Sequence, residues 1–406
     1  GGRIRTDRSM GAPIEYGAGW IHGPSADNPI KQLADHVGAN TYETDDDNLE
    51  LFTAQGRPLT DQEYKLFDAF YAKLDREIGK HVQPGDTRSL QDAIKDLAPE
   101  VLNDPIGRWM ISAYFEFDLG AGLENISAEN AFEDEAFVGD DVIFSEGYDA
   151  ILSPLVAGLD VRLNTPVQQI SYDDRGVDVD GMRADYVVCS VPLGVLKAGT
   201  ITFDPPLPLQ VQNAIDEIGF GTVTKIALKF NKPFWDIATQ YFGVMTETMG
   251  RWNYWQNYRT FSDQNILLGL SFGNYAPVAD KMNQREMTED AMAVLRDVWG
   301  DAVPPPLDVL TTHWSEEQNF KGAYSYPQVG GSITQYDSFA APIAGVSDTI
   351  TTLRQQNIKI GSKGFPVTMA FSGQELSGEY AVNINNAVNG SVVASLTAFP
   401  TFPVAP

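Results

Sequence analysis

The chain has 406 residues and a formal net charge of −27, because 55 acidic side chains outnumber 28 basic ones. Apolar residues make up 43% of the chain, which is enough for a folded core and excludes global disorder. The acidic balance argues against a nucleic-acid-binding protein, the single cysteine (Cys189) excludes an internal disulfide framework, and no apolar run reaches the roughly 18 residues of a membrane span.

The pattern of the first 135 residues predicts loops followed by a helical block. The aspartates at 45–47 predict a solvated loop, because the run lacks the glycine and the distal glutamate of a calcium loop. A helical period from Thr60 places five side chains on one face: Tyr64, Phe67, Phe70, Tyr71 and Leu74. Ser89 is the expected N-cap of a second helix, and a third is expected from about Asp104 through Phe117. Residues 60–135 are therefore expected to be mainly helical.

The remainder of the chain predicts strands that alternate with helices. Three short strands are expected within residues 161–172, 176–181 and 184–192, with Val177 and Val179 alternating with aspartates as in a half-exposed strand. Further strands are expected at 223–230 and 266–272, a helix at 288–299, and a helix in the small-residue stretch 387–398. Because helix and strand blocks interleave, the predicted fold class is α/β or α+β.

Common catalytic and metal-binding motifs are absent from the sequence. It contains no HExxH, GxSxG, Walker or CxxC motif, and its four histidines are too scattered to predict a metal site. Any chemistry must therefore be inferred from longer segments.

Six segments, in order along the chain, resemble the flavin-containing amine oxidases. They are GGRI at 1–4 with EYGAGWIHG at 15–23, VIFSEGY at 142–148, SVPLGVLK at 190–197 with ITFDPPLP at 201–208, TKIALKF at 224–230 with FW at 234–235, HWS at 313–315, and GAYSYPQVG at 322–330. WIHG and GAYSY look most like the polyamine and spermine oxidase branch. The family's GxGxxG turn, which cradles the FAD pyrophosphate, is expected to precede residue 1, so the chain resembles a family member without its first βα unit.

Lys225 matches the active-site lysine of that family, which holds a water near the flavin. In that role it would position or deprotonate the amine substrate. The strand pattern alone supports another interpretation, because Lys225, Ala227 and Lys229 share one face and Lys225 then resembles an ordinary exposed lysine.

Three further residues are substrate candidates by the same resemblance. Trp20 and His22 match residues of the substrate tunnel, and Tyr324 matches one wall of an aromatic cage over the flavin. The alternatives are a solvated or capping histidine and a core tyrosine in a strand.

The resemblance also implies the cofactor site. Trp314 matches a tryptophan near the flavin ring, and Val167 matches a valine whose backbone contacts the adenine. The implied FAD-contacting residues are Gly2, Arg3, Gly17, Ala18, Val167, Trp314, Gly373, Gln374, Asn383 and Ile384.

The C-terminal segment departs from the family pattern. FSGQEL stands at 371–376 where FAGExT is expected, so Gln374 replaces the glutamate. In YAVNINNA at 380–387, Asn385 and Asn386 replace the histidine and the glycine that lets the backbone approach the flavin.

The resemblance implies a two-domain amine oxidase fold: an FAD-binding domain from 1–45, 136–205 and 336–406, and a substrate domain from 46–135 and 206–335. The implied reaction is FAD-dependent oxidation of an amine to an imine, which is then converted to an aldehyde, with release of hydrogen peroxide. A polyamine is the expected substrate and oxygen the expected acceptor.

The acidic surface has two interpretations: it would attract polyamines, or it would serve solubility or a salty habitat. The rival interpretation is a cofactor-free binding or scaffold protein. Neither compartment nor oligomeric state follows from the sequence.

Overall fold

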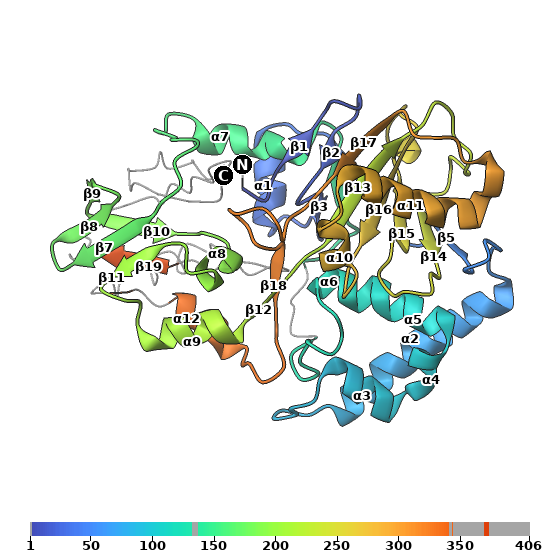
Figure 1. The fold of residues 1–406 in the computed structure, drawn as a ribbon, viewed down its shortest axis with the longest axis horizontal. Helices are drawn as coiled ribbons and strands as arrows, with labels where there is room; N and C mark the ends of the chain where they lie inside the picture. The colour runs from blue at the N-terminus through green and yellow to red at the C-terminus, as the bar shows by residue number, and fades with distance from the viewer. Residues whose placement is uncertain (1, 132–136, 341–342, 344–368, 373–406) are drawn as a thin grey trace.

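The computed structural model describes residues 2–131, 137–340, 343 and 369–372, in which helices and strands interleave along the chain (Figure 1). Within these ranges the strands form six sheets, so the mixed fold class predicted from the sequence is confirmed. None of the helices in the described ranges is both long and apolar enough to cross a membrane.

The largest sheet has six strands in the order β17, β13, β16, β15, β14 and β5, and each neighbouring pair is antiparallel except β14 with β5. In that order the strands are Asp308–Thr311, Thr224–Lys229, Ile266–Ser271, Tyr254–Asn257, Tyr241–Val244 and Leu49–Phe52. Both strands predicted at 223–230 and 266–272 are therefore confirmed.

Each face of this sheet is covered. Helix α11 (Gln284–Trp299) packs on one face, where Met287 and Leu295 join Ile226 and Leu228 in one apolar cluster (Figure 1). Helix α10 (Ala276–Asp280) lies beside it. On the other face, the hairpin of β1 (Thr6–Asp7) and β2 (Ile14–Glu15) brings Met10 and Ile14 against Ala227 and Leu268. The side chains of β13 are therefore enclosed on both faces.

The predicted helical block is confirmed. It consists of α2 (Asp61–His81), α3 (Leu90–Leu97), α4 (Pro99–Asn103), α5 (Pro105–Ile111), a π-helical turn η1 (Ser112–Glu116) and α6 (Phe117–Leu119). Thr60 and Glu63 form a capping box at the start of α2, and Ser89 caps α3 by accepting from the Asp92 amide. Tyr71 was wrongly placed on the buried face: its side chain is 48% exposed and lies edge-on to Tyr114 at the border of the apolar stripe.

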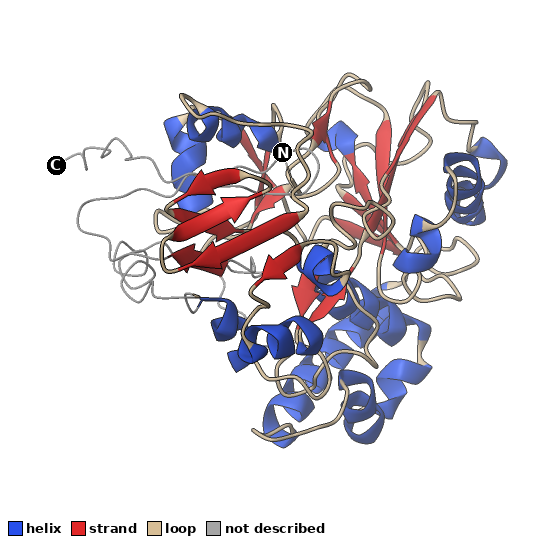
Figure 2. Ribbon diagram, turned by 60° about the vertical axis from the view of Figure 1, so that its left-hand side comes forward, coloured by secondary structure: helices blue, strands red, loops and turns tan. Residues whose placement is uncertain are grey.

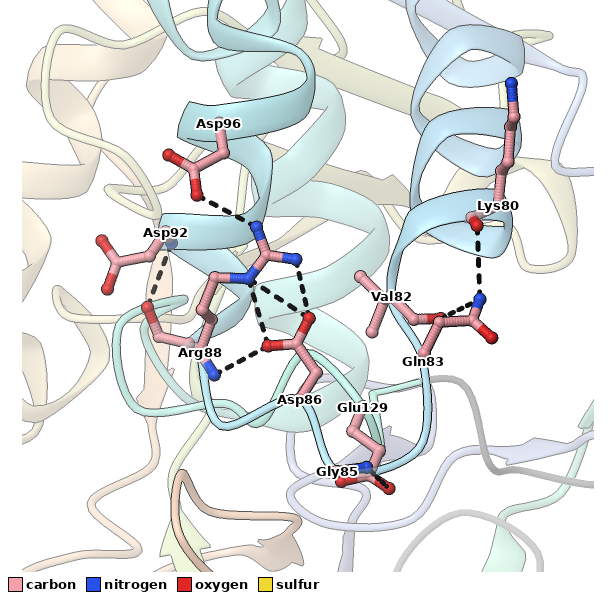
Figure 3. A network of polar contacts seen from close by, with 10 residues as sticks. Lys80, Val82, Gln83, Gly85, Asp86, Arg88, Asp92, Asp96 and Glu129 are labelled. Atoms are coloured by element: carbon pink, nitrogen blue, oxygen red, sulfur yellow. Dashed lines mark hydrogen bonds and ion pairs between the residues drawn. The ribbon is translucent and has the colours of Figure 1, made fainter.

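A polar network fixes the loop between α2 and α3 (Figure 3). The Arg88 guanidinium donates to both carboxylate oxygens of Asp86 and to Asp96 on α3, and the Gly85 amide donates to Glu129. Bidentate pairing of this kind restricts both side chains and the turn that carries them.

A second group of strands lies at the other end of the molecule (Figure 2). One sheet has the order β11, β7, β8, β9 (Thr202–Asp204, Gln169–Asp173, Gly176–Val179 and Met182–Ala184), and β10 (Tyr186–Cys189) pairs with β19 (Met369–Ser372). Val177 and Val179 are buried while Asp178 is half-buried, as the alternation predicts. The strand expected within 161–172 begins only at Gln169, because Asn164 adopts a left-handed backbone with φ 54° and Pro166 has no amide hydrogen to donate.

Helices α8 (Leu193–Lys197), α9 (Leu209–Glu217) and α12 (Thr334–Ala340) pack against this second group, while α7 (Leu152–Val156) follows the 3-10 turn η2 (Tyr148–Ile151). Between the two regions lie β3 (Trp20–Ile21), helix α1 (Pro29–His36) and the pair β12–β18 (Gly219–Gly221, Tyr324–Tyr326) (Figure 1). Strand β3 belongs to the short sheet β3–β6–β4, whose other strands are Val142–Phe144 and Thr41–Glu43. Two 3-10 turns, η3 (Tyr258–Thr260) and η4 (Gly300–Ala302), complete the set.

Other expectations have mixed outcomes. The aspartates at 45–47 form an exposed turn, as predicted. Helix α11 begins at Gln284, before the predicted start at Thr288, because Asn283 and Glu286 form a second capping box. The predicted helix at 387–398 lies outside the described residues. The boundaries of the two domains stay a prediction.

Candidate active site around Lys225

Lys225 lies on β13, the strand next to the edge strand β17, and is buried with 7% of its surface exposed. Its ammonium nitrogen Nζ donates to the main-chain oxygens of Glu15 at 3.0 Å and Gly17 at 2.7 Å. The interpretation of Lys225 as an exposed lysine is therefore wrong. The strand pattern shows which side chains share a face, but it does not show that residues 10–17 cover that face.

The segment that holds Lys225 depends on a close approach of two backbones. The Tyr16 and Ala18 amides donate to the carbonyl oxygens of Arg5 and Arg3. A β-carbon on Gly17 would lie 1.7 Å from the Arg3 oxygen, so only glycine fits there. This packing places the Gly17 carbonyl within reach of Lys225.

A small cavity adjoins the ammonium group. Its volume is about 20 Å³, which is roughly the room that one water molecule needs. It is lined by Pro13, Glu15, Gly19, Trp20, Ile143, Phe144, Lys225, Gln256, Tyr258, Phe261 and Leu268. Polar groups from Glu15, Gln256 and Tyr258 make the cavity suitable for water rather than for an apolar group.

The buried ionisable groups of this site have displaced pKa values. Burial lowers the pKa of Lys225 to about 8, and the negative charge of Glu15 partly opposes that change. Burial raises the pKa of Glu15, although hydrogen bonds from the Tyr148 amide and the Thr6 hydroxyl, together with Lys225, favour its charged form. A lysine with this pKa exchanges protons near neutral pH, whereas an exposed lysine does not.

Trp20 and His22 lie at different distances from Lys225. Trp20, on β3, lines the cavity, and its ring centroid lies 5.9 Å from the Lys225 Nζ. His22 is exposed and pairs with Asp141, with 2.5 Å between its Nδ1 and the Asp141 Oδ2. The structure therefore brings Trp20, but not His22, to the cavity.

Tyr324 is half-buried at the start of β18. Its hydroxyl donates to the Phe117 carbonyl oxygen, its ring packs with Phe117, Phe272 and Leu270, and burial raises its pKa. It does not line the cavity beside Lys225. These contacts match a tyrosine at the border of an apolar cluster, and the cage position stays a prediction.

Several cofactor candidates lie near one another. The indole of Trp314 is buried, donates to the Tyr16 oxygen at 3.0 Å and packs edge-on against Phe320. Its ring is 3.4 Å from the position that a β-carbon on Gly17 would occupy. Gly2 is buried with φ 62°, and Ala18 is exposed. Gly2, Arg3, Gly17, Ala18 and Trp314 are thus neighbours around one segment.

Arg3 tests whether these residues fit an anionic cofactor. Its guanidinium donates to the Ala323 oxygen at 2.7 Å, burial lowers its pKa, and no carboxylate pairs with it within the described ranges. A partly buried guanidinium without a carboxylate partner suits a phosphate group, which it can bind through two parallel hydrogen bonds. The residues present therefore fit FAD in the region of its diphosphate.

The other cofactor candidates are elsewhere. Val167 is buried in the core of the second group of strands, just before β7. Gly373, Gln374, Asn383 and Ile384 lie outside the described residues. In the part of the chain that the structure describes, no cluster of acidic, histidine or cysteine side chains could hold a metal ion.

Sequence reasoning missed three polar residues that line this cavity: Glu15, Gln256 and Tyr258. Glu15 opens the segment EYGAGWIHG, and an acidic residue between the apolar Ile14 and Tyr16 is the signal that could have found it. Tyr258 follows β15 in η3 and carries no recognisable sequence signal.

Comparison with known proteins identifies the family. A profile of the flavin containing amine oxidoreductases matches residues 1–350. Polyamine oxidase 2 of Arabidopsis thaliana is 31% identical over 84% of this chain and 74% of its own length. A protein of Drosophila melanogaster described as a possible lysine-specific histone demethylase 1 is 32% identical over 57% of this chain and 29% of its own length.

A solved structure of putrescine oxidase bound to putrescine has the same fold, with a TM-score of 0.66, 19% identity and 84% of each chain covered. The α/β two-domain fold expected from the resemblance is thereby confirmed. The chain belongs to the family of flavin-containing amine oxidoreductases, and its cofactor is FAD.

Proposed function

We propose that this protein oxidises a polyamine at one of its C–N bonds, producing an imine that water hydrolyses to an aldehyde and a shorter amine. When bound, FAD would supply the acceptor for the hydride of the α-carbon, and oxygen would take up the two electrons with two protons to give hydrogen peroxide. The observation that carries the proposal is a buried lysine ammonium beside a water-sized cavity.

The proposed role of Lys225 is to manage the proton of the substrate amine. Hydride loss requires the free amine, but polyamines are protonated near neutral pH. With a pKa near 8, about a tenth of the Lys225 side chains are neutral at pH 7, and the neutral amine can accept that proton through a water in the cavity. The two carbonyls that bind Nζ keep the group aimed in one direction.

The proposed substrate class is supported by charge and by aromatic surface. The net charge of −27 favours encounter with cations, and Trp20 offers a π-face beside the cavity. His22 and Tyr324 are proposed to contact the amine farther from Lys225. The similarity to polyamine oxidase 2 agrees with this assignment.

The first test is a pair of lysine variants on one strand. Lys225→Met is expected to slow reduction of bound FAD by spermine by roughly 100-fold or more, because the proton acceptor is lost. Lys229→Met is the matched control, since Lys229 faces the same way but binds the Met10 oxygen. The measurement is stopped-flow loss of flavin absorbance under anaerobic conditions. Equal rates for the wild type and Lys225→Met would remove Lys225 from the mechanism.

The second test separates the enzyme from a cofactor-free binding protein. The purified chain should show flavin absorbance, with or without added FAD, and should release peroxide when given spermine. A protein that binds no FAD, and is therefore colourless once the unbound cofactor has been removed, would contradict the proposal and support the binding protein.

A peptide with a methylated lysine is the comparison substrate, because one relative is named as a histone demethylase. Turnover of that peptide alone would contradict the polyamine assignment.

A further inference from the structure

Glu15 is a buried carboxylate that joins three parts of the molecule. Its side chain is only 9% exposed, with Oε1 accepting from the Tyr148 amide and Oε2 accepting from the Thr6 hydroxyl, both at 2.8 Å. Its main-chain oxygen binds the Lys225 ammonium. Through this one residue, β1, the start of η2 and β13 are connected.

The surroundings of Glu15 contain few opposing charges. Arg8, the nearby arginine, forms an exposed pair with Asp149 through two hydrogen bonds, of 2.6 and 3.1 Å. Tyr148 and Tyr258 are buried phenols whose pKa values are raised, so they stay neutral. Lys225 is therefore the buried cation that balances Glu15 among the groups around this cavity.

We propose that Glu15 is a positioning residue for Lys225, with two actions that rest on the proposed function. Its carboxylate, held by Thr6 and Tyr148, fixes the segment whose carbonyl groups at 15 and 17 orient the ammonium. The same carboxylate is the buried counter-charge that keeps part of Lys225 protonated. Thr6 and the Tyr148 amide are thereby supports of the site.

The Glu15→Gln variant separates charge from shape. Glutamine keeps the size of the side chain and an oxygen that accepts one of the two hydrogen bonds, but it removes the negative charge. Without that charge, nothing from Glu15 opposes the lowering of the Lys225 pKa that burial causes. The titration midpoint of Lys225 should fall by about one pH unit or more, the range expected for loss of a nearby opposite charge.

The experiment titrates lysine side chains by NMR in protein labelled at the lysine ε-carbon, with the Lys225 signal assigned from Lys225→Met. Glu317→Gln is the matched control, because Glu317 pairs with Arg5 at the surface. A lower midpoint in Glu15→Gln and an unchanged one in Glu317→Gln support the proposal. An unchanged midpoint in Glu15→Gln overturns it.

A second variant and a second readout keep the test decisive. If Glu15→Gln does not fold, Glu15→Asp retains the charge at a greater distance and should lower the midpoint less, while no change overturns the proposal. In the holoenzyme, the pH dependence of flavin reduction should move with the NMR midpoint. Because the NMR titration needs neither FAD nor substrate, a shifted midpoint in an inactive protein contradicts the polyamine oxidase function but not the role of Glu15.

Discussion

Gly17 illustrates how one missing side chain determines the geometry of the site. The Arg3 oxygen occupies the space of a β-carbon on Gly17, and the Gly17 oxygen binds Lys225. A methyl group at this position would push the two backbone segments apart. The Lys225 ammonium would then lose one of its two carbonyl partners. The absence of a β-carbon at residue 17 therefore determines both the packing of the two segments and the binding of Lys225.

Gly17→Ala is therefore expected to destabilise the protein by about 3 kcal/mol, the upper range for overpacking a rigid site. The measurement is the free energy of unfolding in urea. Gly79→Ala is the control, because Gly79 is an exposed residue inside α2 with open space around it. That change should stabilise the protein by up to about 1 kcal/mol through helix propensity. A Gly17→Ala protein as stable as the wild type would show that the two segments can separate freely.

The site was predictable in part. Lys225, Trp20, Gly17 and Trp314 were found through sequence resemblance, and the structure brings them together around residues 15–20. The burial of Lys225 was not predictable from strand alternation, because the covering segment lies some 210 residues away in the chain. Glu15 escaped notice because its role depends on partners from three separate elements.

The π-helical turn η1 shapes a different buried site. It ends with Glu116, which is 3% exposed and accepts from the Ser112 hydroxyl at 2.8 Å. Gly273 leaves room for this carboxyl group, since a β-carbon there would lie 2.6 Å from it. The next residue, Phe117, supplies the oxygen that binds Tyr324. Burial, with some help from the charge of Glu124, raises the pKa of Glu116 to about 7.

Glu116 is expected to make stability fall as pH rises. Its pKa is about 7 in the folded protein and 4.5 ordinarily, so between these values the folded state binds the proton more tightly and the free energy of unfolding decreases. Glu116→Gln mimics the protonated form. Above pH 7 it should be more stable than the wild type by about 3 kcal/mol, and the difference should shrink steadily as the pH falls from about 7 towards 4.5.

Urea unfolding at several pH values measures this difference, with the exposed Glu289→Gln as control. A difference between wild type and Glu116→Gln that does not vary with pH would contradict the raised pKa of Glu116.

Element boundaries were predictable where local signals decide them. The caps at Thr60 and Ser89 start α2 and α3 because their side chains bind free amides within the same few residues. The strand expected within 161–172 was shortened by a left-handed turn at Asn164, which is not a residue that demands such a turn. The six-stranded sheet depends on pairings between distant segments, which no local pattern encodes.

The charge of −27 concerns the whole molecule rather than any one pair. Many ion pairs in the described ranges lie at the surface, where a single pair contributes little to stability. The excess of carboxylates instead produces a long-range field, which dissolved salt screens within about 8 Å at physiological ionic strength. Such a field acts on the encounter with a charged substrate.

If polyamines are the substrates, kcat/KM for spermine should fall by about tenfold when the ionic strength rises from about 0.01 M to about 0.15 M. The decrease should be smaller for putrescine, which carries fewer ammonium groups, and kcat should change little for either. Steady-state peroxide release measures all of these values. Equal salt dependence for the two amines would mean that the net charge serves solubility instead.

The hydrogen bond from Arg3 to the Ala323 oxygen joins positions 320 residues apart. A ribosome adding about 5–20 residues each second needs on the order of 15–60 s to make the intervening chain. During that interval the Arg3 guanidinium has no carbonyl partner at residue 323. The loop between residues 3 and 323 is among the longest that the chain can form. Loop closure of this length is slow and entropically unfavourable. The contact between Arg3 and residue 323 therefore cannot form until most of the chain has been synthesised.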